Sequence, residues 1–295
     1  MDGSENIRFI EAKTILSKLR QADTWFGIMY NMNLYRGCQH GCIYCDTRSE
    51  CYGVGDISRV SVKRNALELL ADELKAKRNS KGTIGTGSMN DPYMPIEREM
   101  GLTRRALQVI ADRKFPAHVI TKGELVRRDT DVLQQISGVY AAVSFTITTA
   151  DESLGSKLEP HASPVGLRFD AMRHLAENGI YTGITMMPLL PFINDRVDQV
   201  KEILQKAKDN GASYVVPMFG MTLRKGSREY FYGMLDRHFP GMRQRYETTF
   251  GEQYECFSPA YRDLNKAFLE ETDRLGLSRR IKFFQPPSDP QLSLF

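Results

Sequence analysis

Three cysteines lie close together in this 295-residue chain and could hold metal jointly. Cys38, Cys42 and Cys45 follow the spacing C-x3-C-x2-C within the run GCQHGCIYC. Three thiolates are one fewer than the four protein ligands that usually hold a [4Fe–4S] cluster. An incomplete ligand set leaves a metal position open, as it does in catalytic zinc sites. The spacing therefore indicates a cluster with one iron that a ligand other than protein must fill.

The residues around the cysteines extend this pattern. Residues 33–48 read NLYRGCQHGCIYCDTR. This run resembles the N-P-Y-x-G-C-x-H-G-C-x-Y-C-Y-A-R motif of the spore photoproduct lyase-like (DNA repair photolyase-like) group of the radical S-adenosylmethionine (SAM) superfamily. The chain departs from that motif at Leu34, Asp46 and Thr47. The resemblance implies a [4Fe–4S] cluster on the three cysteines, SAM on the open iron, and Tyr44 near the adenine of SAM.

A structural zinc site is the other interpretation of the same loop. Structural zinc takes four closing ligands, and the further candidates nearby are His40 and Cys51. Five cysteines, three of them in one loop, argue against a disulfide framework and fit a reducing cytoplasm. No run approaches the roughly 18 apolar residues of a membrane span, and the N-terminus lacks an apolar signal core. We therefore expect a cytoplasmic protein without a membrane partner.

Short apolar runs alternate with amphipathic segments from the cysteine loop to about residue 217. We expect strands at residues 30–35, 83–87, 117–121, 139–147, 181–187 and 213–217. We expect helices at residues 62–78 (with Ser61 as N-cap), 103–111, 129–136, 164–178 and 195–208. Six β–α alternations predict an α/β fold with a parallel sheet and outer helices, and the site at the carboxyl ends of the strands. The resemblance implies that this sheet is an open, partial (β/α)6 barrel of the TIM type.

The chain changes character beyond the last predicted strand. Helices expected at residues 228–239 and 262–275 are richer in aromatic and charged residues. The stretch that follows them is rich in proline and is expected to be extended or disordered. We therefore divide the chain into a radical SAM partial barrel over residues 1–225 with its cluster loop at 37–46, a C-terminal helical extension over 226–284, and a flexible tail over 285–295.

Polar residues follow several predicted strands, where the resemblance places SAM. It implies that Ser88 and Asp91, after the second strand, hold the methionyl ammonium. It also implies that Lys122, in a T-K-G turn, and Ser144, on the fourth strand, lie near the carboxylate. Glu159 lies in LEPHASP, which resembles the family's L-E-P-R-x-x-S-P. Each has an ordinary alternative, since strand-end lysines are often solvated and Asn-Asp-Pro is a common turn.

The hydrogen relay of spore photoproduct lyase is incomplete in this chain. The family enzyme uses a cysteine near the strand-two turn and a tyrosine after the third cluster cysteine. The resemblance places Ser88 and Asp46 at these positions, and a serine hydroxyl holds its hydrogen too strongly to give it up as an atom. We expect a related, lyase-like enzyme that is not an authentic spore photoproduct lyase. Cys51 is the candidate replacement donor, although a lone cysteine is more often a small buried hydrophobe.

The resemblance also implies the type of reaction. A reducing electron donor would drive cleavage of SAM to methionine and a 5′-deoxyadenosyl radical, which takes hydrogen from the substrate. Our leading hypothesis for that substrate is a damaged or modified base in DNA, which such an enzyme must extrude from the stack. The net charge of +4 permits a nucleic-acid partner without arguing for one. Basic pairs that could contact phosphate are Arg104 and Arg105, Arg127 and Arg128, and Arg279 and Arg280.

Two alternatives stay open for the function. The enzyme could keep the cofactor and act on RNA, a peptide or a small metabolite instead of DNA. Alternatively, the chain could be a non-enzymatic Fe–S or zinc-binding adaptor of the replication machinery. SAM cleavage without added substrate separates the adaptor from the enzymes, and a salt-dependent affinity for DNA separates the two enzyme hypotheses.

The last five residues carry a separate signal. They are Gln291, Leu292, Ser293, Leu294 and Phe295. They resemble the Q-L-S/D-L-F pentapeptide by which bacterial polymerases and repair proteins dock on the DNA sliding clamp. In such a peptide the last two side chains fill an apolar pocket and the glutamine fixes the register. The alternative is a tail that packs back on the core of the protein.

Overall fold

The computed structural model describes residues 7–286, and its centre is a seven-stranded sheet in the order β10-β9-β8-β7-β6-β3-β2. The parallel strands are β3 (Ile28–Met32), β6 (Thr83–Gly85), β7 (Ala117–Thr121), β8 (Ala141–Thr146), β9 (Tyr181–Met186) and β10 (Tyr214–Pro217). The short strand β2 (Leu16–Lys18) runs antiparallel along the β3 edge. Within residues 7–286 the edge strands β2 and β10 do not pair with each other, so the sheet is an open partial barrel.

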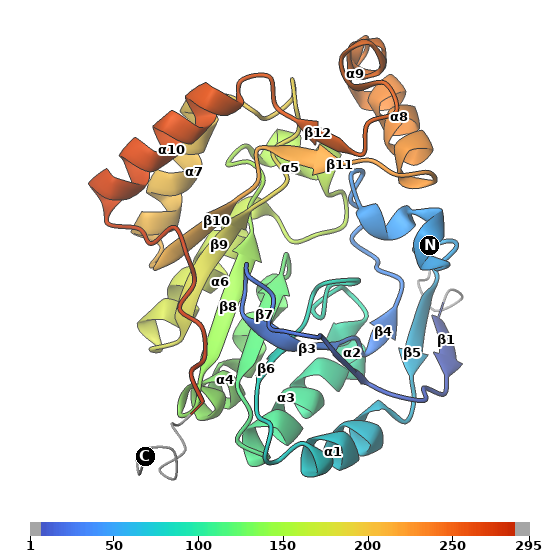
Figure 1. The fold of residues 1–295 in the computed structure, drawn as a ribbon, viewed down its shortest axis with the longest axis vertical. Coiled ribbons are helices and arrows are strands. Elements are labelled where there is room, and N and C mark those ends of the chain that lie inside the picture. The colour runs from blue at the N-terminus through green and yellow to red at the C-terminus, as the bar shows by residue number, and fades with distance from the viewer. Residues whose placement is uncertain (1–6, 287–295) are drawn as a thin grey trace, which may run out of the picture.

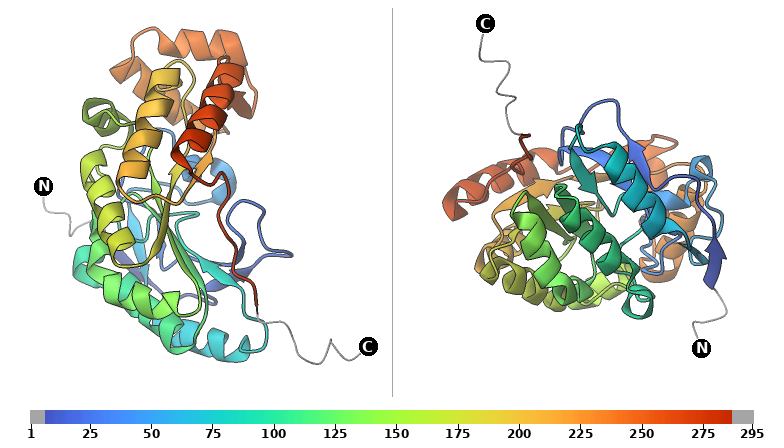
Figure 2. Two further views of the ribbon diagram at one scale, coloured as in Figure 1. Left: turned by 90° about the vertical axis from the view of Figure 1, so that its left-hand side faces the viewer. Right: turned by 90° about the horizontal axis from the view of Figure 1, so that it is seen from below.

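Helices cover the outer side of this sheet (Figures 1 and 2). The longer ones that connect the strands are α1 (Ala66–Ala76), α3 (Leu102–Asp112), α4 (Thr130–Ser137), α6 (Val165–Glu177) and α7 (Val197–Asp209). All six residues of β8 are buried, as expected for a parallel strand covered on both faces. The predicted strands and helices occur in the predicted order, with ends that differ by a few residues. The strand predicted at residues 30–35 was wrong at its end, because β3 ends at Met32 and Tyr35 belongs to a strand of another sheet. Among the described residues, no helix has the length and apolarity needed to cross a membrane.

One predicted helix was wrong at its start. The segment Val60–Lys63 is not helical but forms β5, which pairs parallel with β1 (Ile7–Ile10) and antiparallel with β4 (Tyr35–Arg36). Its burial alternates with a period of two, as in a strand with one face on the core. Ser61 therefore lies inside a strand and cannot cap the following helix, which begins at Ala66.

The C-terminal part adds three helices and a pair of antiparallel strands, β11 (Gly220–Thr222) and β12 (Glu255–Phe257), which we call the β11–β12 hairpin although two helices lie between the strands. The helices between them are α8 (Ser227–His238) and α9 (Met242–Phe250), and α10 (Tyr261–Leu275) packs against α7. The sequence predicted α8 and α10 but missed the hairpin and α9. The division of the chain near residue 225 stays a prediction, and the clamp-like residues 291–295 lie outside the described residues.

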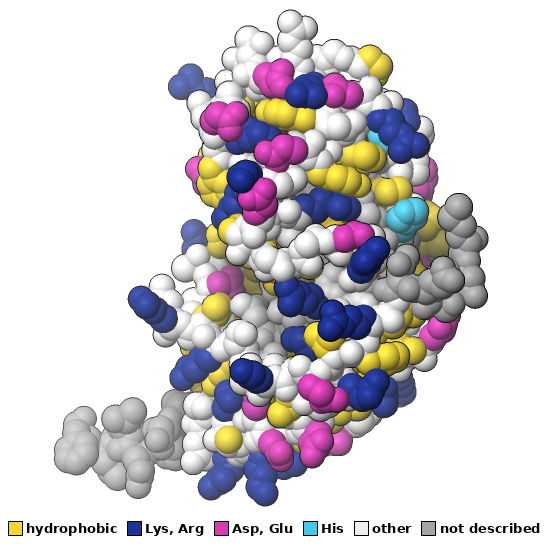
Figure 3. Space-filling model, turned by 90° about the vertical axis from the view of Figure 1, so that its right-hand side faces the viewer, with side chains coloured by type: hydrophobic (Ala, Val, Ile, Leu, Met, Phe, Trp, Pro, Cys, Tyr) yellow, Lys and Arg dark blue, Asp and Glu magenta, His cyan; other side chains and the backbone are white. Residues whose placement is uncertain are grey.

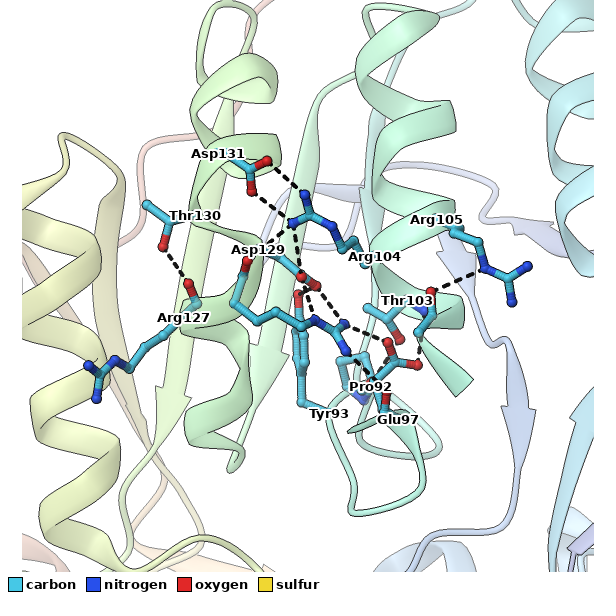
Figure 4. Close-up of polar contacts among 12 residues, drawn as sticks. Pro92, Tyr93, Glu97, Thr103, Arg104, Arg105, Arg127, Asp129, Thr130 and Asp131 are labelled. Atoms are coloured by element: carbon cyan, nitrogen blue, oxygen red, sulfur yellow. Dashed lines mark hydrogen bonds and ion pairs between the residues drawn. The ribbon is translucent and has the colours of Figure 1, made fainter. Parts of the chain in front are cut away.

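Two buried carboxylates, Glu97 and Asp129, lie in the segments that follow β6 and β7 (Figure 4). Glu97, on the short helix α2 (Glu97–Met100), accepts hydrogen bonds from the Tyr35 hydroxyl and from Arg128 at 2.7 Å. Asp129 accepts from the same Arg128 at 2.7 Å and from Arg104 at 3.3 Å. Arg104 and Arg128 are therefore engaged in internal ion pairs, which removes them from the candidate phosphate contacts.

Candidate active site

A cavity of about 510 Å³ opens among the carboxyl ends of the parallel strands. The three cysteines Cys38, Cys42 and Cys45 lie on its wall. The ends of β6, β7, β8 and β9 supply further lining residues, among them Thr86, Ser88, Asp91, Lys122, Thr146 and Thr185. The predicted site at the carboxyl ends of the strands is therefore a real cavity, and it brings the cysteine loop together with three strand-end groups chosen from the sequence.

Backbone contacts on two sides hold the cysteine loop. The Cys38 N–H donates to the Ile57 carbonyl at 2.7 Å, and the Ile43 N–H donates to the Leu158 carbonyl at 2.9 Å. Gly37 has φ +88°, and a Cβ there would lie 2.7 Å from the same Ile57 oxygen. Only glycine permits both this left-handed conformation and this close approach. The loop is thus positioned by the fold around it.

The donor set fits a multi-iron cluster better than a single ion. Burial raises the pKa of Cys38 to about 11 and that of Cys42 well above its usual range. Thiolates in such surroundings need a bound cation to stabilise them. Within residues 7–286, no three His, Cys, Asp or Glu side chains converge as ligands of one ion. A cluster places each thiolate on a different iron, so its cysteines need not converge.

The additional ligands that a zinc site would need are engaged elsewhere. The His40 ring nitrogen Nδ1 lies 3.4 Å from a carboxylate oxygen of Asp91, and both side chains are buried. Cys51 is exposed, and its sulfur accepts from Arg224 at 3.4 Å. Cys51 is also not among the residues that line the cavity. These contacts favour the three-cysteine cluster over a closed zinc site.

A buried group of charges supports the wall of the cavity beside the third cysteine. The Tyr44 hydroxyl donates to Glu159, which also forms an ion pair with Arg168. The Lys122 ammonium lies 5.8 Å from the centre of the Tyr44 ring. Burial opposes the charge of Lys122, but its electrostatic interactions with Cys42, Glu159 and Asp91 outweigh burial and raise its pKa. Lys122 is therefore a cation on the cavity wall. Glu159 does not line the cavity but contacts Tyr44, which does.

Two of the residues predicted from the sequence to contact SAM form hydrogen bonds with other residues of the protein. The Asp91 carboxylate accepts from the Thr121 hydroxyl and the Lys122 N–H, each at 2.6 Å. The Ser144 hydroxyl is bonded to His118 at 2.8 Å and to the Tyr214 hydroxyl at 2.7 Å. Asp91 lines the cavity, whereas Ser144 is not among its lining residues. Ser88 lines the cavity and is exposed.

Sequence reasoning missed Thr86, Thr146 and Arg168. The Thr86 hydroxyl lines the cavity and, among the described residues, is one of the few buried side-chain oxygens without a hydrogen-bond partner. Such a group is a ready contact for a polar ligand. Arg168 could have been found, because it interrupts the apolar stripe of Val165 and Phe169 at helical spacing. Thr86 and Thr146 carry no comparable signal.

Comparison with known proteins decides the family. The radical SAM superfamily model matches residues 32–207, more than half of the chain. The chain belongs to the radical SAM superfamily. Its cofactors are accordingly a [4Fe–4S] cluster and SAM, and solved relatives hold one or the other. In this radical SAM protein the three cysteines would hold the cluster, and the polar wall around Lys122 would hold SAM.

Individual relatives differ in how much is known of them. An uncharacterized protein of Methanocaldococcus jannaschii is 33% identical over 217 residues, which are 72% of this chain and 78% of that protein. The radical SAM Nalpha-GlyT isomerase of Pseudomonas phage M6 is 25% identical over 182 residues, 62% of this chain and 37% of that enzyme. Spore photoproduct lyase complexed with dinucleoside spore photoproduct has a similar fold, with a TM-score of 0.69 at 14% identity over 91% of this chain and 79% of that one.

Proposed function

We propose that this protein is a radical SAM enzyme that acts on a damaged or modified base in DNA. The observation that carries the proposal is the continuity of the cavity. It extends from the three cysteines and Lys122 to Tyr52 and Thr222. Tyr52 is 37% exposed, and we take this end of the cavity as its mouth. A base extruded from a helix could enter this mouth and approach SAM. The similar fold of spore photoproduct lyase, which was solved with a dinucleoside lesion, supports the choice of DNA.

The chain's own residues have separate tasks in this proposal. When bound, the cluster and SAM supply a carbon-centred radical by reductive cleavage of the sulfonium, and the protein orients the reactants and excludes water. Lys122 pairs with the SAM carboxylate, and Ser88 and Thr86 offer hydroxyls to its polar end. Glu159 fixes the Tyr44 ring through its hydrogen bond. Asp91 acts as a positioning residue, because it fixes the backbone of Lys122.

A basic groove beside the cluster loop also supports a nucleic-acid partner. Arg8, Arg36 and Arg59, against the single carboxylate of Asp56, line a second cavity of about 730 Å³ next to β1 and β5. Lys and Arg side chains gather across the middle of this face of the molecule (Figure 3). Guanidinium groups in such a groove suit the phosphates of a nucleic-acid backbone. We call this cavity the arginine groove.

The test of the DNA substrate is a salt titration. We expect the reconstituted enzyme with SAM, without reductant, to bind ultraviolet-irradiated DNA. The affinity should fall steeply with salt, because each neutralised phosphate contributes about 0.9 to the slope of log affinity against log salt. Arg36→Gln and Arg59→Gln together should flatten that slope. Binding with no salt dependence, or no binding at low salt, would refute the DNA proposal.

The reaction type need not be that of spore photoproduct lyase, and we predict negligible repair of authentic spore photoproduct. Ser88 lies on the cavity wall. The sequence resemblance aligns it with the hydrogen-donating cysteine of the family enzyme, and a hydroxyl cannot replace that thiol. Thymidine recovered from a synthetic lesion dinucleotide measures the activity. Many turnovers per enzyme would show that another residue donates hydrogen, and Cys51 would then be the first to substitute.

We also propose that the tail, residues 291–295, binds the DNA sliding clamp. A peptide covering residues 286–295 should bind purified clamp with an affinity near micromolar, about −8 kcal/mol, because an extended anchor needs no folded scaffold. Removing Leu294 and Phe295 should abolish most of this binding. A fluorescent-peptide titration measures it. Failure to saturate below about a millimolar would leave the tail without this role.

A further inference from the structure

Three planar side chains stand together at the end of the cavity that Tyr52 lines. They are Tyr52, Arg224 and Tyr254, here called the Tyr–Arg–Tyr group. Tyr52 ends the short 3-10 helix η3 (Glu50–Tyr52) and lines the cavity. The other two extend from the β11–β12 hairpin, where the Leu223 N–H donates to the Tyr254 carbonyl at 2.8 Å. The Arg224 guanidinium carbon lies 4.5 Å from the centre of the Tyr254 ring and 5.6 Å from that of Tyr52.

Hydrogen bonds fix the orientation of this group. Arg224 donates to the Tyr254 oxygen at 2.6 Å and to the Tyr52 oxygen at 3.2 Å. The Tyr52 hydroxyl in turn donates to Asp46 at 3.0 Å. Asp46 directly follows the third cysteine, where the spore photoproduct lyase-like motif has a tyrosine. In this chain a carboxylate takes that position and orients a tyrosine six residues farther along.

The backbone beneath the group is tightly joined. The Glu50 N–H donates to the Lys225 carbonyl at 3.0 Å. Gly226 has φ +90°, and a Cβ there would lie 2.8 Å from the Arg48 carbonyl oxygen, so only glycine allows this approach. These contacts hold η3 against the segment that follows β11. A ligand that binds between them therefore loses little conformational entropy by ordering the protein.

The exposure and charge of the group indicate what it could bind. Tyr52 is 37% exposed and Tyr254 is 43% exposed, so ring surface is accessible at the mouth. The carboxylate nearest to Arg224 is that of Asp46, at 4.0 Å. Exposed aromatic rings beside a guanidinium form the surface on which unstacked nucleobases lie, because each base has a π face and a polar edge.

We propose that the Tyr–Arg–Tyr group binds one unstacked nucleobase of the substrate at the entrance of the cavity. This inference rests on the proposed function and names the residues that receive the base. The Arg36 guanidinium, in the arginine groove, donates to the carbonyl of Gly53, the residue after Tyr52. The groove therefore begins beside the group, and a phosphate next to the bound base would meet it. Base and backbone contacts would then be adjacent.

The test uses oligonucleotides that carry one unpaired 2-aminopurine, made as DNA and as RNA. The reconstituted enzyme with SAM, without reductant, is titrated into each, and the fluorescence quench reports stacking of that base. We expect Tyr254→Ala to weaken binding about tenfold and to reduce the quench. Tyr254→Phe should behave as the parent, because the ring remains. The salt slope should not change in either variant, since no phosphate contact is lost.

Phe257→Ala is the matched control, because Phe257 is 45% exposed on the same hairpin but its ring lies beside Tyr261 and is not part of the Tyr–Arg–Tyr group. It should bind as the parent, and melting temperatures and cluster absorbance should show that all variants are folded. Unchanged quench and affinity in Tyr254→Ala would overturn the inference and leave the DNA proposal standing. An equal loss in Tyr254→Phe would also overturn it. Binding of RNA alone, with the same dependence on Tyr254, would support the base site and refute DNA as the substrate. Binding of neither would refute both.

Discussion

Replacing Cys38, Cys42 and Cys45 together with alanine should abolish both iron binding and SAM cleavage. The three thiols line one cavity, and we propose them as the protein ligands of the cluster, so nothing on the loop would hold iron after their removal. Iron content and visible absorbance after anaerobic reconstitution measure the cluster. Formation of 5′-deoxyadenosine with dithionite measures the cleavage. Both should fall to background.

The matched control for this experiment is Cys256→Ala. Cys256 is buried on β12, away from the cavity lining. The variant should retain the cluster and most of the SAM cleavage of the parent protein. SAM cleavage that survives in the triple variant, at more than background, would contradict the assignment of the cluster to these cysteines.

Replacing Arg128 with methionine should lower the free energy of unfolding by about 3–5 kcal/mol. Arg128 pairs with Glu97 and Asp129, and both carboxylates are fully buried. Its removal leaves their charges without their main partner in a region of low polarity. Urea unfolding, with the free energy extrapolated to water, measures the loss. The Tyr35 hydrogen bond to Glu97 carries the effect toward the cluster loop, so iron uptake should also become less complete.

Arg127→Met is the control for the ion-pair network. Arg127 is the exposed neighbour of Arg128, and its side chain makes none of the ion pairs found among the described residues. Its replacement should change the free energy of unfolding by less than about 0.5 kcal/mol. A loss below about 1 kcal/mol in Arg128→Met would mean that Arg104 and Tyr35 suffice to satisfy the two carboxylates.

The parallel strands could be predicted from the sequence because each is a short apolar run, and that pattern can be recognised without knowing its partner strands. β7 and β8 are apolar runs between turns and helices, and each occurs close to its predicted place. β5 could not be predicted in the same way. It has four residues, and its partners β1 and β4 come from other parts of the chain, so its strand character depends on long-range pairing. The β11–β12 hairpin was missed for the same reason, since some thirty residues separate its strands.

The same distinction between local and long-range features decides which parts of the candidate site could be predicted. The spacing of the cysteines is local and predicted the cluster loop directly. Ser144 and Thr146 share one face of β8, but only Thr146 lines the cavity, because Ser144 lies deeper, beside His118 and Tyr214. Depth along a strand depends on where neighbouring side chains close the cavity floor. That depth cannot be read from one strand alone, and neither can the contact that places Tyr52 beside Arg224.

The measurement that tests the central claim most directly is the rate of 5′-deoxyadenosine formation by the reconstituted enzyme with dithionite and SAM. It should be compared without DNA, with intact DNA and with ultraviolet-irradiated DNA. We predict slow formation without DNA and a several-fold higher rate with irradiated DNA than with intact DNA. No 5′-deoxyadenosine under any condition would contradict the assignment as a radical SAM enzyme, and equal rates under all three would contradict DNA damage as its substrate.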